Sequence, residues 1–313
     1  MDQELNAICG DAIEELKRIR SNSVNLIVTD PPYNLNKDYG NNQDKLEFED
    51  YLRFSREWLS EAKRVLTNDG TIYVFMGVRY ISFIYTILEQ ELSMNFNSWI
   101  TWHYTQGIGK TKGFSPRHDD ILMFTKDSQK FVFNLDAVRV PQKFYRSINN
   151  MRGANPGNVW EFSHMHYCNK NRKAHPTQKP EGLYERMILA SSNEGDTVLD
   201  PFLGSGTLLR VCQQTNRKGI GIDINPDYIA MATERLQEPF AGFDSVDDRM
   251  KRIPNDLTDV AIRNDYVKKH IAWFLANHPD VVDDFLQSVV EKYGCHLRDP
   301  NRNTQMMFAG LEA

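Results

Sequence analysis

The stretch Thr197-Val198-Leu199-Asp200-Pro201-Phe202-Leu203-Gly204-Ser205-Gly206-Thr207 decides the fold. Its apolar start predicts a buried strand over residues 197–199, and a helix is expected from Leu208 to Gln214. A glycine turn between a strand and a helix lets a ligand approach the backbone closely at the edge of a sheet. The next expected strand, residues 219–222, ends at Asp223, where a carboxylate is placed to accept the hydroxyl groups of a ribose.

Outward from this stretch, apolar runs alternate with amphipathic segments, which favours an α/β fold: a doubly wound, mostly parallel sheet wrapped by helices. Strands are expected over residues 24–28, 71–76, 99–104 and 121–125. Helices are expected over residues 48–66, 81–92, 181–190 and 226–236. Asp69-Gly70 is expected to separate the helix at 48–66 from the strand that follows it.

The composition, 41% hydrophobic and 25% charged, is that of a globular protein with a sizeable core. No apolar run approaches the roughly 20 residues of a membrane span, and the N-terminus lacks the pattern of a secretory signal. We therefore expect a cytoplasmic protein with no membrane partner. The four cysteines have no metal-ligand or redox spacing, so no metal is expected: Cys9, Cys168, Cys212 and Cys295.

The net charge of −5 hides a basic segment. Between Ser128 and Lys173 stand eight basic residues and two acids, Asp136 and Glu161. A patch of this kind can neutralise phosphates of a nucleic acid, although a solvated loop region has the same composition. The candidate DNA-binding residues of this segment are Lys130, Arg139, Lys143, Arg146, Arg152, Arg172 and Lys173.

The pattern changes after about residue 240. Two amphipathic segments, roughly Leu257 to Leu275 and Val281 to Tyr293, predict a small helical C-terminal extension over residues 241–313. Nothing in this extension carries chemistry.

Asp30-Pro31-Pro32-Tyr33 follows the expected strand at 24–28, at a place where open α/β sheets bind ligands. An amino nitrogen on an aromatic base is a poor nucleophile, because its lone pair is delocalised into the ring. Asp30 and the carbonyl of Pro31, in a rigid Pro31-Pro32 frame, can accept its two N–H bonds and localise that lone pair. Tyr33 can stack on a base that has been flipped out of the duplex. A surface turn capped by the aspartate is the structural alternative.

The glycine turn does not fit a nicotinamide dinucleotide. That fingerprint requires a third glycine three residues after Gly206, where this chain has Leu209. No basic group stands beside the turn for a pyrophosphate. A nucleoside without phosphates, such as S-adenosylmethionine, fits the turn and Asp223 better.

These motifs resemble the β class of amino-group DNA methyltransferases, over residues 8–236. That class has the Asp-Pro-Pro-Tyr element first, a target-recognition region next and the cofactor glycine loop last, and this chain has the same order. His175-Pro176-Thr177-Gln178-Lys179-Pro180 matches the element that the class places before the glycine loop, and Cys9-Gly10-Asp11-Ala12 matches its contact to the cofactor's adenine.

The resemblance implies S-adenosyl-L-methionine as the cofactor and Asp30, Pro31, Pro32 and Tyr33 as catalytic residues. It implies that Asp223 holds the ribose, that Ile224 packs on the cofactor's adenine and that Asp11 faces its amino group. It also implies four parts: a catalytic half (1–104), a target-recognition region (105–174), a cofactor-binding half (175–240) and the extension. The full cofactor-binding set is Asp11, Ala12, His175, Thr177, Gln178, Lys179, Asp200, Phe202, Gly204, Ser205, Gly206, Thr207, Asp223 and Ile224.

We therefore expect a site-specific DNA adenine-N6 methyltransferase that acts on double-stranded DNA, in a restriction–modification system or as a solitary genomic enzyme of a bacterium, archaeon or phage. A companion restriction endonuclease is a candidate partner, and the chain is a candidate to form a homodimer. Cytosine-N4 methylation is the first alternative, because cytosine-N4 members more often carry serine in place of Asp30. A protein or ribosomal-RNA methyltransferase and a non-catalytic DNA-binding protein that binds S-adenosylmethionine are further alternatives.

Overall fold

The computed structural model describes residues 4–34, 46–105, 107, 109–140, 153–165, 173 and 177–239. The predicted C-terminal extension lies outside the described residues, as does much of the predicted recognition region. The chain divides into two compact units, of which the first comprises residues 1–138 and 155–251. The described part of the second unit contains an antiparallel bridge between Val140 and Ala154.

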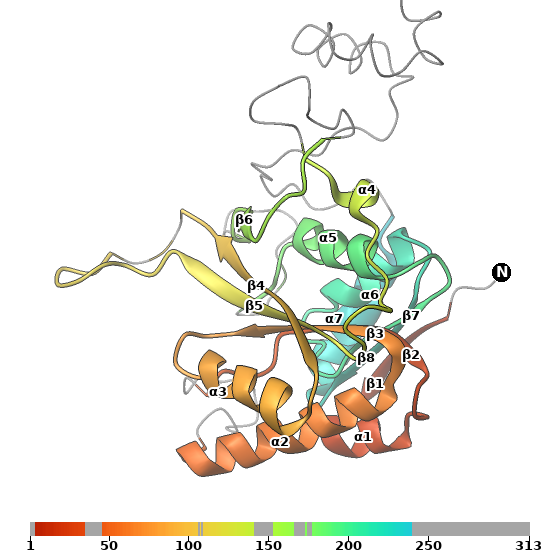
Figure 1. The fold of residues 1–313 in the computed structure, drawn as a ribbon. Coiled ribbons are helices and arrows are strands. Elements are labelled where there is room, and N and C mark those ends of the chain that lie inside the picture. The colour runs from red at the N-terminus through yellow and green to blue at the C-terminus, as the bar shows by residue number, and fades with distance from the viewer. Residues whose placement is uncertain are drawn as a thin grey trace, which may run out of the picture. The chain divides into compact units, whose positions relative to one another are not determined.

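The first unit is built on an eight-stranded sheet with the order β1-β8-β7-β2-β3-β5-β4-β6 (Figure 1). Only β5 runs antiparallel to its neighbours, β3 and β4, within this sheet. The prediction of an α/β fold with a mostly parallel sheet is confirmed. The strands are β1 Leu5–Cys9, β2 Val24–Thr29, β3 Leu66–Met76, β4 Asn95–His103, β5 His118–Thr125, β6 Val159–Glu161, β7 Thr197–Asp200 and β8 Lys218–Asp223.

Helices cover both faces of the sheet (Figure 1). One face carries α1 (Ala12–Arg18), α2 (Phe48–Val65), α3 (Ile81–Thr86) and the π-helix η1 (Ile87–Glu91). The other face carries α5 (Glu181–Ser191), α6 (Thr207–Gln214) and α7 (Pro226–Gln237), and the short α4 spans Leu135–Val138. Successive strand side chains point to opposite faces, so Ile27 packs in the core with α2, whereas Leu26 and Val28 pack in the core with α5 and α6.

The sequence prediction differs from the structure in several elements. It omits β1, α1, α4 and β6, and it treats residues 81–92 as one helix, whereas the last turn is the π-helix η1. It also begins the strand at 71–76 with Thr71, whereas the corresponding strand β3 begins at Leu66. The pairing of β3 with β2 is irregular between Leu66 and Thr71, so Gly70 lies within a distorted strand rather than between two elements.

The parallel strands bring distant loops to one edge of the sheet. Asp30 follows β2, Asp200 ends β7 and Asp223 ends β8. Because β7 lies between β2 and β8, these three carboxylates meet at the carboxyl edge. Asp11 follows β1 there and caps α1, accepting the N–H groups of Ile13 and Glu14. No helix within the described ranges is both long and apolar enough to cross a membrane.

Candidate active site

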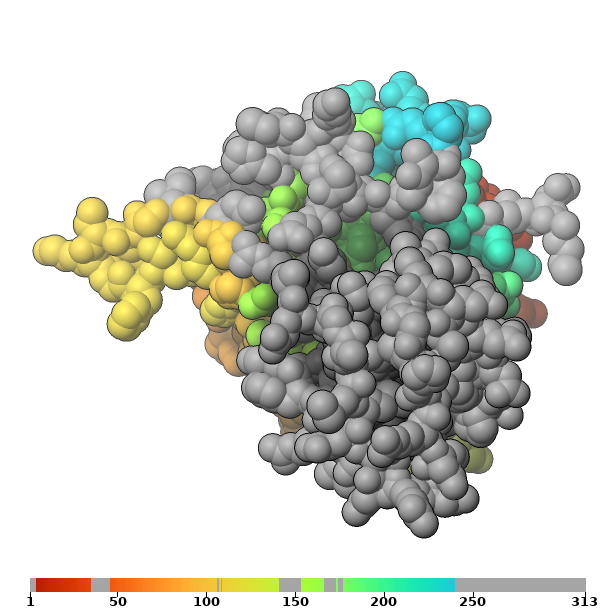
Figure 2. Space-filling view, turned by 90° about the horizontal axis from the view of Figure 1, so that it is seen from above, coloured from red at the N-terminus to blue at the C-terminus, as the bar shows by residue number. Residues whose placement is uncertain are grey.

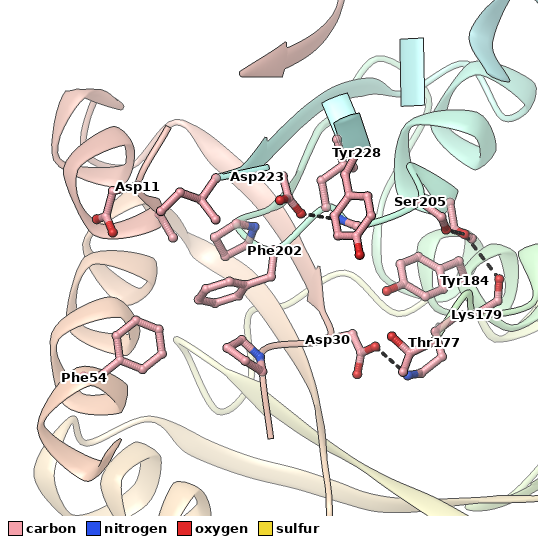
Figure 3. Close-up of a pocket in the computed structure, with 17 residues that line it drawn as sticks. Asp11, Asp30, Phe54, Thr177, Lys179, Tyr184, Phe202, Ser205, Asp223 and Tyr228 are labelled. Atoms are coloured by element: carbon pink, nitrogen blue, oxygen red, sulfur yellow. Dashed lines mark hydrogen bonds and ion pairs between the residues drawn. The ribbon is translucent and has the colours of Figure 1, made fainter. Parts of the chain in front are cut away.

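A cavity opens at this carboxyl edge and contains about 960 Å³ of empty space, including its mouth (Figure 3). It is a single depression into which strand-end loops from both halves of the sequence project. Twelve of the predicted site residues line it: Asp11, Ala12, Asp30, Pro32, Thr177, Lys179, Phe202, Gly204, Ser205, Thr207, Asp223 and Ile224. The remaining lining residues were not predicted: Phe54, Tyr184, Pro201, Leu203 and Tyr228.

The glycine loop is held against β8 by its own backbone. Leu203 donates its N–H to the carbonyl of Ile222 at 2.8 Å, and Gly204 donates its N–H to Asp223 Oδ2 at 2.8 Å. Gly206 has φ of +78°, and a Cβ there would lie 2.5 Å from the Cβ of Ala232. Gly206 is therefore required for the approach of α7 to the loop, and it stands behind the cavity wall rather than in it.

Two carboxylates and one apolar side chain shape the end of the cavity formed by β1 and β8. Asp223 accepts the Asn225 N–H through Oδ1 at 2.9 Å, and burial raises its pKa. Both capping bonds of Asp11 use Oδ1. Ile224 is 41% exposed although it lines the cavity, so it offers apolar surface to a flat ring.

Asp30 is held from two sides at the opposite end. The Tyr33 hydroxyl donates to Asp30 Oδ1 at 2.6 Å, and the Lys179 ammonium lies 2.5 Å from Oδ2 (Figure 3). Burial, followed by the negative charge of Asp30, raises the pKa of the Tyr33 hydroxyl, so Tyr33 remains a donor. The backbone of Pro31-Pro32 is also fixed by α2, because the carbonyl of Pro32 accepts a hydrogen bond from the Tyr51 hydroxyl at 2.8 Å.

Lys179 of the hexapeptide motif contacts both the glycine loop and Asp30. The carbonyl of Lys179 accepts the Thr207 hydroxyl at 3.2 Å, while the Lys179 ammonium contacts Asp30 and lies 5.6 Å from the centre of the Tyr33 ring. Gln178 is turned away from the cavity and accepts the Lys173 N–H at 2.6 Å. His175 lies outside the described residues.

Asp200 is 1% exposed and stands behind the cavity. It accepts the Thr29 hydroxyl at 2.8 Å and the Phe202 N–H at 3.0 Å. Burial dominates these two bonds and raises the pKa of Asp200 to about 7. The negative charges of Asp30 and Asp223 act in the same direction.

We expect this carboxyl to make folding stability depend on pH. Between pH 4 and 7 the folded chain holds a proton on Asp200 that the unfolded chain has released, so the free energy of unfolding falls as pH rises through this window. Asp200→Asn keeps the hydrogen-bond acceptor and removes the titration. The stability of the wild type relative to this variant should fall by about 3 kcal/mol between pH 5 and pH 8, measured by urea unfolding; a constant difference would contradict the assignment.

The charges in the cavity favour a cation. Of the described residues that line it, Asp11, Asp30 and Asp223 are acids, and Lys179 is the one base and is paired with Asp30. A pyrophosphate would be repelled here, whereas a nucleoside that carries a sulfonium and an ammonium group is attracted. The cavity volume and its apolar wall fit S-adenosylmethionine, so the residues present agree with the predicted cofactor. No cluster of three potential metal ligands occurs in the described part of the chain.

The structure describes three of the seven predicted DNA-binding residues, and none of them lines the cavity. Lys130 is exposed, Arg139 donates to the carbonyl of Gly153 at 2.8 Å and Lys173 pairs with Glu238. The other four lie outside the described residues: Lys143, Arg146, Arg152 and Arg172.

Aromatic support from α2 is a feature that sequence reasoning missed. The Phe202 ring lies 5.3 Å from Trp58 and 6.0 Å from Phe54, both edge to face. The helical periodicity of residues 48–66 places these two side chains on the buried face of α2. Which loop they meet depends on the pairing of β2 with β7, which periodicity does not encode.

Comparison with known proteins identifies close relatives. A family model named N6_N4_Mtase, described as DNA methylase, matches residues 24–234. The type II methyltransferase M.HpaI of Haemophilus parainfluenzae is 69% identical over 94% of this chain and 93% of its own length. The DNA adenine methyltransferase YhdJ of Escherichia coli K12 is 39% identical over 73% of this chain and 81% of its own length.

Solved structures agree with this fold. The structure of the M1.HpyAVI–SAM complex superposes with a TM-score of 0.55 at 26% identity, over 75% of this chain and all of that chain. The cytosine-N4-specific PvuII DNA methyltransferase superposes with a TM-score of 0.61 at 19% identity, over 77% of this chain and 89% of that chain. At that identity the second likeness concerns the fold alone.

Proposed function

Because this chain belongs to the N6_N4_Mtase family of DNA methylases, we propose that it methylates N6 of adenine in double-stranded DNA. The prediction of an S-adenosylmethionine-dependent, amino-group DNA methyltransferase is confirmed. Adenine as the target is supported by the carboxylate of Asp30 at the edge of the cavity and by the 39% identity to a DNA adenine methyltransferase.

The proposed cofactor site uses the end of the cavity opposite Asp30. Asp223 would hold the ribose hydroxyls, Asp11 would face the adenine amino group and Ile224 would pack on the adenine ring. The loop around Gly204 and Thr207 would hold the methionine end near Lys179, because the Thr207 hydroxyl and the Lys179 carbonyl are already joined. When bound, S-adenosylmethionine supplies an activated methyl group on its sulfonium, so no metal or covalent enzyme intermediate is required.

The proposed catalytic residues act on the target amino group. Asp30 accepts one N–H and the carbonyl of Pro31 accepts the other, which localises the lone pair on the nitrogen. The Pro31-Pro32 frame and the Tyr51 bond keep these acceptors fixed, and such positioning supplies most of the rate in a reaction with an activated donor. Tyr33, beside Asp30, would contact the face of the flipped base.

The type II relatives belong to restriction–modification systems and act on DNA. We propose the same setting for this chain, in a bacterial cytoplasm where the DNA lies, with a companion endonuclease that recognises the same sequence. Residues 105–174 would read the target sequence, and residues 241–313 are candidates for further contacts to DNA or to a second copy of the chain.

The decisive experiment is incubation of the purified protein with labelled S-adenosylmethionine and mixed-sequence duplex DNA, followed by nucleoside mass spectrometry. We expect N6-methyladenine as the product, in the presence of a metal chelator as well as in its absence. N4-methylcytosine without N6-methyladenine would replace adenine by cytosine as the target. Label in RNA or protein but not in DNA would overturn the proposal.

A further inference from the structure

The β4–β5 connection projects from the sheet as a finger, of which the structure describes residues 105, 107 and 109–117 (Figures 1 and 2, yellow). Its base continues the strand ladder, because Tyr104 donates its N–H to the carbonyl of Arg117 at 2.9 Å. Farther out, Lys110 donates its N–H to the Ser115 hydroxyl at 2.8 Å. These bonds join the two sides of the finger, at its base and again farther out.

The finger rises from the same edge of the sheet as Asp30. Thr29, which precedes Asp30, pairs with Val74 of β3. Two residues on, Met76 pairs with Asp120 at the start of β5, and His103 at the end of β4 pairs with His118. The finger and Asp30 therefore lie at the same edge of the sheet.

The finger carries positive charge and an unburied aromatic ring. Lys110, Lys112 and Arg117 are its charged residues, and it has no acid. Phe114 is 101% exposed, the largest exposure among the large apolar residues that the structure describes as exposed. Acids lie beside its base in the neighbouring strands: Asp120 is buried beside Trp99, the Tyr104 hydroxyl reaches Asp119, and Glu161 pairs with His103. A ring held in water beside basic side chains is the pattern of a surface that binds nucleic acid.

Resting on the proposed function, we propose that this finger binds the DNA duplex beside the target base. Lys110 and Lys112 contact phosphates, and Phe114 packs against the bases in the groove. Lysine side chains supply the phosphate contacts, and an exposed aromatic ring offers a face on which a base can stack. The finger would hold the DNA duplex while the site at Asp30 receives the extruded base.

The test uses two finger variants and one control, all in the full chain with bound S-adenosylhomocysteine. Lys110→Ala/Lys112→Ala should lower the slope of log affinity against log salt by about 2, since each lost phosphate contact removes about 1. Phe114→Ala should keep the slope, weaken binding about tenfold or more and reduce the fluorescence of 2-aminopurine placed at the target adenine. The control, Lys218→Ala, removes an exposed lysine at the amino end of β8. It should change neither the affinity for DNA nor the salt slope.

Unchanged DNA affinity and salt slope in both finger variants, with wild-type methylation intact, would overturn the finger proposal and leave the proposed function standing. The finger proposal would also be overturned if the finger variants methylate DNA normally but lose binding to another protein or to a second copy of the chain. Failure of the wild type to methylate DNA would instead reject the function. Cofactor binding and circular dichroism must match the wild type in each variant, because the finger is separate from the cavity wall.

Discussion

Asp30→Asn is expected to reduce methyl transfer by about 10²- to 10⁴-fold, the range for loss of one acceptor that acts on the reacting group. The amide has the shape of the carboxylate and can still accept the Tyr33 hydroxyl through its oxygen. It cannot neutralise the Lys179 ammonium, which lies 2.5 Å from Asp30 Oδ2, and it offers an N–H where the target amino group needs an acceptor. The chemical step should therefore fail. Because the variant also leaves Lys179 without its partner, circular dichroism must show that it is folded under the assay conditions.

The measurement is single-turnover methylation of duplex DNA, together with calorimetric binding of S-adenosylhomocysteine. Cofactor affinity should change little, because the predicted ribose and adenine contacts at Asp223 and Asp11 are untouched. Asp50→Asn, an exposed carboxylate on α2 that pairs with Arg53, is the matched control and should leave the rate unchanged. Activity of Asp30→Asn within threefold of the wild type would reject Asp30 as the catalytic acceptor.

Lys179→Met is expected to destabilise the protein by about 3–5 kcal/mol, the cost of leaving one partner of a buried ion pair alone. The Lys179 side chain is 6% exposed and that of Asp30 is 15% exposed. Methionine resembles the lysine stem in length but lacks the ammonium, which lies 5.6 Å from the centre of the Tyr33 ring and 5.3 Å from that of Phe75. The loss therefore reports the missing charge. Methyl transfer should fall too, because Asp30 is no longer held from two sides.

A double-mutant cycle separates this pair from general damage. The double variant Asp30→Asn/Lys179→Met carries no unpaired charge. Its loss of unfolding free energy should therefore be much smaller than the sum of the losses in the two single variants. Lys17→Met, which breaks an exposed pair with Glu14, should leave the free energy of unfolding nearly unchanged, because water screens that pair. Additive effects in the cycle, measured by urea unfolding, would show that Lys179 stabilises the site without acting through Asp30.

The strand ends explain why so much of the cavity could be predicted. Asp30, Gly204 and Asp223 each follow or end an apolar run, and a parallel sheet necessarily gathers such residues at one edge. That rule requires only the order of apolar strands in the sequence. It predicts that these three residues lie at one edge of the sheet, which the structure confirms.

What could not be predicted depends on contacts between distant segments. Lys179 contacts Asp30 across 149 positions of sequence, and no local pattern distinguishes this from the predicted contact to the cofactor. Strand β1 was missed because Leu5-Asn6-Ala7-Ile8-Cys9 is only half-buried and lacks a clear alternation. The π-helix η1 was missed because its periodicity over five residues resembles that of an α-helix.

The pairing of β1 with β8 has a consequence for the synthesis of the protein. Cys9 and Ile224 make contact 215 residues apart, so β1 must wait for β8, the last strand in the described part of the chain. At ordinary rates of synthesis this delay is roughly 10 to 40 s. By the proposed role of Asp223, a nascent chain has no complete site for the methyl donor until β8 has emerged. Newly made molecules therefore begin to modify DNA only after residue 223 of the 313 has been translated.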